Sequence, residues 1–150
     1  KSAIRLGETI ATHTLPTAAT CGLLTKHQTG SDGFVDCHEQ WQGQTGHVAF
    51  FSSVSADQAL DLEVLAGFDG PFRLWIGVNE IITGLDGTNP AVRDAVRKSL
   101  RLKKGVYQVT VLMALNHGKA WGFFLRFGRT NLTPAETASG QVALPVPLAN

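Results

Sequence analysis

The stretch LDLEVLAGFDGPFRLWIGV, residues 60–78, contains two alternating apolar segments joined by a turn sequence. Apolar residues occupy every second position from Leu60 to Val64 and again from Phe72 to Val78, which is typical of half-buried β-strands. Between them, residues 68–71 (FDGP) favour a turn, because Asp-Gly tolerates positive φ and Pro fixes its own φ. The stretch therefore predicts a β-hairpin, whose outer face is expected to carry Asp61, Glu63, Arg73 and Trp75.

The same strand pattern recurs in three other segments. Residues 47–54 (HVAFFSSV) and 106–115 (VYQVTVLMAL) are rich in strand-forming residues, and residues 121–127 (WGFFLRF) alternate apolar and other positions. Gly118 lies in the short segment 116–120 and suits a tight turn. The last two strands are therefore predicted to form a second hairpin.

One segment, residues 90–98, predicts a short helix, because Asn89 is a suitable N-cap and Pro90 suits the first helical position. Many short strands separated by turn sequences indicate an all-β fold. We expect an antiparallel β-sandwich of the jelly-roll type, with at most one short helix near 90–98.

The chain has 150 residues, the size of one ordinary domain, with 43% hydrophobic and 17% charged residues. We expect residues 1–132 to form the sandwich and residues 133–150 to be a linker or an extended C-terminal tail. The chain would then be one module of a larger polypeptide. No apolar run approaches the roughly 20 residues of a membrane-spanning helix, so no membrane partner is expected.

The net charge of +1 argues against nucleic-acid binding, but the basic residues are unevenly distributed. Six of the 13 basic residues lie within twelve positions: Arg93, Arg97, Lys98, Arg101, Lys103 and Lys104. This basic cluster is either a solvated face beside a turn or a contact for an anionic polymer such as an acidic polysaccharide. The two cysteines, Cys21 and Cys37, are either bonded or two buried thiols.

Catalytic motifs are absent from the sequence, which contains no nucleophile-elbow, phosphate-loop or zinc-protease pattern. The acidic residues of segment 32–39 are either a carboxylate pair for acid–base chemistry or a polar loop. A small lyase or hydrolase that uses His38, His47 or His117 is the least favoured hypothesis. We expect the isolated domain not to be an enzyme.

Three tryptophans suggest sugar recognition, because an aromatic ring covers the apolar face of a pyranose while nearby polar groups bind its hydroxyls. The alternative for each tryptophan is packing in the core or at its edge. The candidate ligand-binding residues are Trp121, Asn116, His117, Lys119, Trp75, Arg73, Asp69 and Trp41.

Two polar loops are rich in oxygen ligands of the kind that Ca²⁺ prefers. Asp69 lies at the predicted tip of the first hairpin, and segment 86–89 (DGTN) forms a second polar loop that begins with Asp86. Turn formation alone also explains both loops. The sequence therefore leaves a calcium site and an ordinary pair of turns as alternatives.

Four consecutive motifs carry a family resemblance: AGFDGPFRLWIG (66–77), DGTNP (86–90), LRLKKGVYQVTVLMAL (100–115) and NHGKAWGFFLRF (116–127). They resemble the galactose-binding-like β-sandwich modules appended to polysaccharide-degrading enzymes. Within that group, the chain is most similar to the calcium-dependent sugar-binding module of α-L-rhamnosidases. That resemblance implies a calcium site in which Asp69, Asn89 and the carbonyl of Pro90 are ligands. The chain departs from the family pattern at Gly70, where the family tends to have a second polar ligand.

The resemblance implies a non-catalytic carbohydrate-binding module that targets an attached polysaccharide-degrading enzyme to its glycan. The expected partners are a polysaccharide or oligosaccharide, acidic if the basic cluster contributes, and a catalytic domain in the same polypeptide. The expected location is secreted or cell-envelope, in a bacterial extracellular or periplasmic setting. The alternative is a structural inter-domain β-sandwich of a glycoside hydrolase or lyase that has no ligand of its own.

Overall fold

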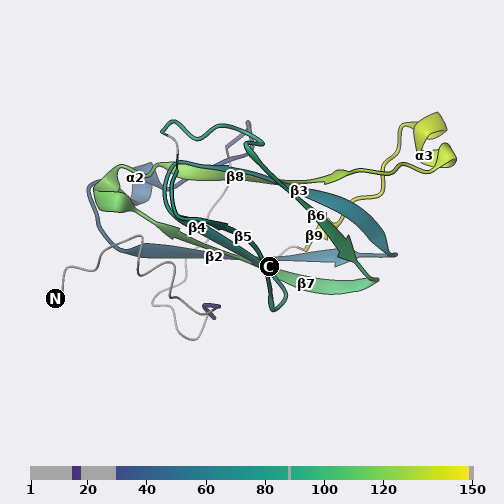
Figure 1. The fold of residues 1–150 in the computed structure, drawn as a ribbon, viewed down its shortest axis with the longest axis horizontal. Coiled ribbons are helices and arrows are strands. Elements are labelled where there is room, and N and C mark those ends of the chain that lie inside the picture. Colours follow the sequence, from purple (N-terminus) through teal and green to yellow (C-terminus); the bar gives the residue numbers. More distant parts are fainter. Residues whose placement is uncertain (1–14, 18–29, 88, 149–150) are drawn as a thin grey trace.

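A computed structural model describes residues 15–17, 30–87 and 89–148, which form two antiparallel sheets packed face to face. Sheet A has four strands in the order β1 (Phe34–Asp36), β8 (Gly122–Arg129), β3 (Leu60–Phe68) and β6 (Val96–Leu102). Sheet B has five, in the order β5 (Asn79–Gly84), β4 (Phe72–Ile76), β7 (Gly105–Ala114), β2 (His47–Ala56) and β9 (Val146–Pro147). Figure 1 shows the two layers, and the predicted all-β sandwich is confirmed.

The core lies between the inner faces of the two sheets. Alternate residues of β3, including Leu62 and Val64, face alternate residues of β4 and β7 across it. Phe72 is fully buried, with its ring stacked on that of Phe68 at 4.6 Å and tilted against that of Phe123 at 5.4 Å. These rings fill the space between the sheets near one end of the sandwich.

Neither predicted hairpin is present, although the predicted strands are. Strand β3 belongs to sheet A and β4 to sheet B, so residues 69–71 are an inter-sheet connection. The same holds for β7 and β8, which residues 115–121 connect. The pairs that were expected to share one outer face are therefore separated. Asp61 and Glu63 belong to sheet A, whereas Arg73 and Trp75 belong to sheet B.

The predicted helix near 90–98 is also wrong. Residues 96–102 are the edge strand β6, which pairs with β3 from Ala66↔Val96 to Leu60↔Leu102. A turn at Asp94 (φ 58°) precedes the strand, and the Asp94 carboxylate accepts a hydrogen bond from Arg126 Nε at 2.9 Å. A continuous strand ladder and this ion pair thus outweigh a local capping signal for a helix of at most three turns.

Among the described residues, the short helices lie elsewhere: α2 (His38–Trp41), the 3₁₀ turn η2 (Asn116–Gly118) and α3 (Pro134–Ser139). No helix in the described part of the chain is long and apolar enough to cross a membrane. Helix α3 projects beyond the sheets at the right-hand end of Figure 1.

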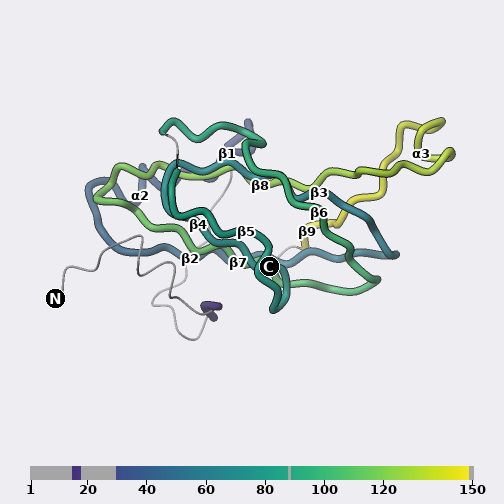
Figure 2. Tube along the Cα trace, viewed as in Figure 1, coloured from purple at the N-terminus to yellow at the C-terminus, as the bar shows by residue number. Residues whose placement is uncertain are grey.

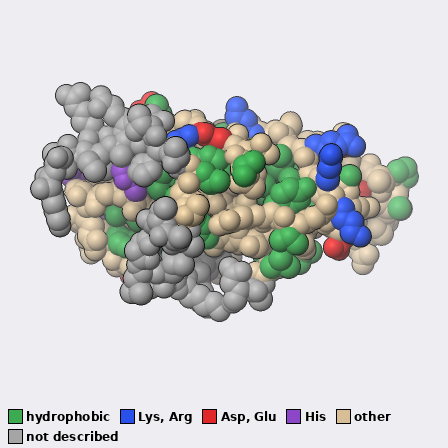
Figure 3. Space-filling view, turned by 90° about the horizontal axis from the view of Figure 1, so that it is seen from below, with side chains coloured by type: hydrophobic (Ala, Val, Ile, Leu, Met, Phe, Trp, Pro, Cys, Tyr) green, Lys and Arg blue, Asp and Glu red, His purple; other side chains and the backbone are tan. Residues whose placement is uncertain are grey.

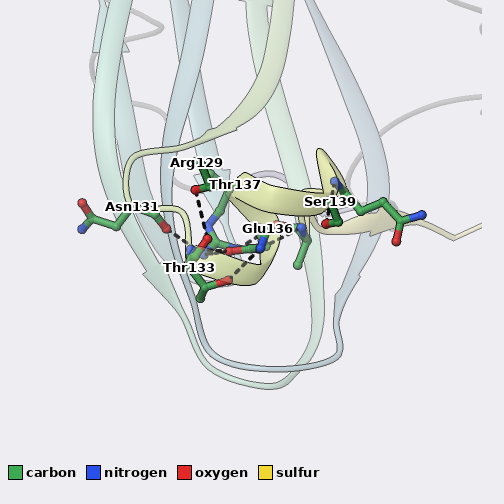
Figure 4. A network of polar contacts seen from close by, with 8 residues as sticks. Arg129, Asn131, Thr133, Glu136, Thr137 and Ser139 are labelled. Carbon is green, nitrogen blue, oxygen red and sulfur yellow. Dashed lines mark hydrogen bonds and ion pairs between the residues drawn. The ribbon is translucent and has the colours of Figure 1, made fainter.

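The C-terminal segment, which the sequence predicts to be a linker or an extended tail, folds back onto the sandwich. Helix α3 has a capping box, in which the Thr133 side chain accepts from Glu136 N and the Glu136 side chain accepts from Thr133 N. Glu136 also pairs with Arg129 at 3.0 Å and accepts from Ala143 N at 3.0 Å (Figure 4). Further along, β9 pairs with β2 at Val54↔Pro147.

Candidate functional site

Three connecting segments meet at one end of the sandwich, which we call the loop end: residues 69–71, residues 85–87 with 89–95, and residues 115–121. Gly87 packs directly on the backbone of Asp69 and leaves no room for a Cβ. Asn89 Nδ2 donates a hydrogen bond to Lys119 O at 2.8 Å. Segments that are far apart in the sequence therefore lie side by side, at the left-hand end of Figure 2.

Asp69 joins the two inter-sheet connections. Its side chain is buried and accepts hydrogen bonds from the backbone N–H of Trp121 (2.9 Å) and of Gly122 (3.0 Å). Burial raises the pKa of the Asp69 carboxyl, and the two amide donors oppose that rise only in part. The sequence identified Asp69 as a polar group at a turn but gave no sign of these partners, which lie 52 and 53 positions away.

Trp121 is the exposed indole of the loop end, with 49% of its surface accessible. The imidazole of His38 stacks on it, with ring centroids 4.4 Å apart and planes inclined by 22°. Cys37 N donates to Trp121 O at 2.6 Å, and His38 N donates to Asp36 Oδ1 at 2.7 Å. Pairing of β1 with β8 thus brings His38 beside Trp121, a partnership that no spacing in the sequence indicates.

The turn before Trp121 has an uncommon backbone. Asn116 (φ 49°), His117 (φ 58°) and Gly118 (φ 76°) all lie in the left-handed region. Glycine adopts this region freely and asparagine does so more readily than most residues, whereas His117 bears a cost of roughly 1–2 kcal/mol. His117 and Lys119 are exposed, and Asn116 is half-buried. The structure therefore keeps these predicted polar residues together with Trp121 at the loop end.

Trp75 lies outside this site, and the expectation that it is exposed is wrong. It is 3% accessible and packs with Leu112, Ala114 and Leu15 on the outer face of sheet B. The Arg73 guanidinium lies 4.7 Å from the centre of the Trp75 ring. A buried indole offers no surface on which a ligand from solvent can stack.

Arg73 has a structural partner on the same sheet. Its Nε donates to Glu80 Oε1 at 2.9 Å, and the bonds from Arg73 hold the pKa of the Glu80 carboxyl below its usual range. Trp41, in α2, is half-buried and packs edge-on against Phe50, with ring centroids 6.0 Å apart. Arg73 and Trp41 therefore both have packing roles.

The residues expected to bind calcium fit that role poorly. Both Asp69 carboxylate oxygens face amide donors, whereas Ca²⁺ takes six to eight oxygen ligands. Asn89 uses its amide nitrogen in the bond to Lys119, and Asp86 and Pro90 are exposed. Within residues 15–17, 30–87 and 89–148, no group of three or more His, Cys, Asp or Glu side chains has the arrangement of a metal site.

Ion pairing accounts for part of the basic cluster. Arg97 pairs with Glu63 and Arg101 with Asp61, each at 3.6 Å. Lys103 and Lys104 form the turn between β6 and β7, and the ten residues of β7 place this turn about 30 Å from the loop end. In Figure 3 most Lys and Arg side chains lie toward the right-hand end and the His side chains toward the left. One small ligand therefore cannot contact both the Lys103–Lys104 turn and Trp121.

Cys37 is a buried free thiol. Burial, followed by the nearby charges of Asp69 and Asp36, raises its pKa to about 12. Such a thiol is a poor nucleophile at neutral pH. For Cys37 the structure thus shows the buried thiol, one of the two predicted alternatives. Cys21 lies outside the described residues.

No protein-family model matches the chain, and no curated protein matches its sequence. Two solved structures of β-glucosidase from Kluyveromyces marxianus share its fold: one of selenomethionine-labelled enzyme, the other in complex with glucose. Each is 17% identical to the chain, with a TM-score of 0.54 over 71% of its length. The match spans only 14% and 15% of those chains. The chain is thus similar in fold to a small part of a glycoside hydrolase, and neither structure is a rhamnosidase.

Proposed function

We propose that the chain is a non-catalytic carbohydrate-binding module that targets an attached polysaccharide-degrading enzyme to its glycan. The observation that carries this proposal is the half-exposed indole of Trp121, which His38 supports at the loop end. The apolar face of a pyranose stacks on such a ring, and Asn116, His117 and Lys119 provide polar groups for its hydroxyls. Trp75 is excluded from this role by its burial.

The expected affinity is weak, because one ring and a few exposed polar groups bind one or two sugar units. Dissociation constants in the high micromolar to millimolar range correspond to roughly −4 to −6 kcal/mol. A tethered module is useful at this affinity because the linkage raises the local concentration of the enzyme at its substrate. The polypeptide would then act outside the cell or in the cell envelope, where such glycans occur.

Glucose and gluco-oligosaccharides are the first ligands to test, since the fold is shared with part of a β-glucosidase and one of those structures contains glucose. The panel extends to rhamnose and to uronate polymers, each with calcium and with EDTA. Calcium dependence would support a metal site, which the geometry of Asp69 does not favour. Binding of uronates that weakens steeply with added salt would support a contribution from the basic cluster.

The decisive test compares three variants by affinity electrophoresis and calorimetry. Trp121→Ala should bind at least about tenfold more weakly, and Trp121→Phe should retain part of the affinity because it keeps an aromatic ring. Val106→Ala removes an exposed apolar residue at the far end of β7 and should bind like the wild type. Full binding by folded Trp121→Ala would refute the proposed site. A panel that stays blank for the wild type would favour the alternative, a structural inter-domain sandwich.

A further inference from the structure

We propose that Asp69 is a positioning residue for Trp121, and that its carboxylate holds the indole-bearing backbone in place without a divalent cation. This inference rests on the proposed function, because it concerns the same site. Asp69 follows the last residue of β3, and Trp121 precedes the first residue of β8. The β3–β8 ladder ends at Phe68↔Phe123, so both residues lie just beyond it.

The Asp69 side chain extends this ladder past its end. Asp69 N donates to Gly122 O at 3.4 Å, while its carboxylate accepts from Gly122 N at 3.0 Å and from Trp121 N at 2.9 Å. These bonds satisfy two backbone donors that have no strand partner on that side. Without the carboxylate, Trp121 would keep, within the described part of the chain, only the bond from Cys37 N, and Gly122 would keep its pairing with Asp36 and the bond from Asp69 N.

The opposite side of the Trp121 backbone is held as well. Trp121 O accepts from Cys37 N at 2.6 Å, and the His38 ring then covers one face of the indole. Asp69 and the β1–α2 segment therefore fix Trp121 from two directions. A stacking ring that is already fixed loses little conformational freedom when a sugar binds, and this favours affinity.

A cation in this place would have to bind a carboxylate whose two oxygens already accept hydrogen bonds from the protein backbone. Each carboxylate oxygen of Asp69 accepts from a backbone N–H, and an N–H group is not a ligand for Ca²⁺. The Asp69 carboxylate thus fixes the Trp121 backbone through hydrogen bonds, where a bound metal ion would fix it through coordination. We expect sugar binding to be unchanged by EDTA and to depend on Asp69.

The test uses the whole chain, labelled with ¹⁵N, and compares Asp69→Ala and Asp69→Asn with Asp94→Asn. Asp94 is a matched control, because its carboxylate pairs with Arg126 and is not bonded to the Trp121 backbone. Asp69→Ala should shift the amide resonances of Trp121 and Gly122 strongly, and Asp69→Asn should shift them less because one oxygen remains. Asp94→Asn and added Ca²⁺ should leave both amides in place.

The binding measurement uses cellobiose as the probe. Affinity should fall about two- to tenfold in Asp69→Ala, the cost of ordering one long side chain on binding, and Asp69→Asn should recover part of it. Unchanged amide resonances in Asp69→Ala would overturn the anchoring of Trp121, as would a calcium-induced shift of those amides. Shifted amides with unchanged affinity would overturn the positioning role.

Two further outcomes separate this inference from the proposed function. If Asp69→Ala does not fold, the positioning role is tested with Asp69→Asn alone, by the shifts of the Trp121 and Gly122 amide resonances and by the affinity for cellobiose. If the wild type binds neither cellobiose nor any other sugar, the proposed function and the positioning role both fail. The amide resonances still show whether Asp69 anchors Trp121.

Discussion

Replacing Gly70 by alanine distinguishes the observed inter-sheet connection from a hairpin tip. At a hairpin tip a new methyl group would point into solvent and be tolerated. In the structure, a Cβ on Gly70 would lie 2.6 Å from Ala120 Cβ and 2.8 Å from Ala114 O. Both distances are well below ordinary contact, so the two inter-sheet connections must move apart to accept it.

The size of the effect follows from these two contacts. Ordinary contact begins near 3.4 Å, so the neighbours of the new methyl group must shift by several tenths of an ångström, and one of them is a backbone carbonyl that cannot rotate away. Overpacking of this kind costs about 1–3 kcal/mol. For a domain of this size, each kcal/mol lowers Tm by about 2–4 °C. We therefore expect Gly70→Ala to melt roughly 2–12 °C below the wild type.

Thermal unfolding followed by circular dichroism measures this difference, with two comparison variants. Gly43 has φ +71°, and a Cβ added to it would meet no atom within 4 Å, so Gly43→Ala tests backbone strain alone. Adding Ala120→Gly should restore part of the stability of Gly70→Ala and none of that of Gly43→Ala. A Gly70→Ala variant that melts within about 1 °C of the wild type would show that the connections do not pack as described.

Three further predictions concern stability and reactivity. Phe72→Ala should lower the free energy of unfolding by about 3–5 kcal/mol in urea titrations, because the ring is fully buried between Phe68 and Phe123; a loss below about 1 kcal/mol would contradict this packing. The Cys37 thiol, with a pKa of about 12, should resist alkylation at pH 8 until the protein is unfolded, as peptide mapping by mass spectrometry would reveal, and rapid labelling of the native protein would count against its burial. Hydrogen bonds from the N–H groups of Thr133 and Ala143 lower the pKa of Glu136 to about 2. Because this pKa is below the usual 4.5 of an unfolded chain, the stabilisation is present above about pH 4.5 and is lost as the pH falls toward 2. The protection of the α3 backbone amides against hydrogen exchange should therefore decrease over the same pH range, and Glu136→Gln should abolish the pH dependence of this protection.

The sequence located five of the nine described strands, β2, β3, β4, β7 and β8, because alternation depends only on which face of a strand is buried; the short or edge strands β1, β5, β6 and β9 were missed. The segments around Leu60, Phe72 and Val106 are strands as predicted. Alternation carries no information on which sheet a strand joins, however. The short connection after Phe68 is long enough either to turn back within one sheet or to cross to the other, so both predicted hairpins were plausible and both were wrong.

Helix prediction failed for a related reason. Asn89 and Pro90 are good local signals for a helix start, but the residues that follow complete sheet A as β6, and pairing with β3 outweighs local preference. The helix that does form near the C-terminus had a stronger signal. Thr133, Pro134 and Glu136 make up a capping box with Pro at the first helical position, and this motif was available in the sequence.

The candidate site was predicted in part. Trp121 and its polar neighbours were named from the sequence, yet the same reasoning also favoured Trp75, which is buried. Both tryptophans belong to alternating segments, and the difference between them lies in what covers them. Leu15 and the side chains of β7 pack on Trp75. In the described part of the chain, His38 is the one aromatic ring that stacks on Trp121, and it covers a single face of the indole. Such coverage depends on the tertiary structure and leaves no local pattern.

The topology explains why the segments that hold Trp121 meet at the loop end. Strand β3 neighbours β8 in sheet A, and β4 neighbours β7 in sheet B. The end of β3 lies beside the start of β8 (Phe68↔Phe123), and the start of β4 lies beside the end of β7 (Phe72↔Met113). The two connections that join these strands therefore cross between the sheets side by side, and a single acidic residue in one can bind the backbone of the other. Trp121 is consequently carried by two anchored strand ends and not by a free hairpin tip, and a fixed position of this kind is what the proposed binding site, with its few contacts, requires.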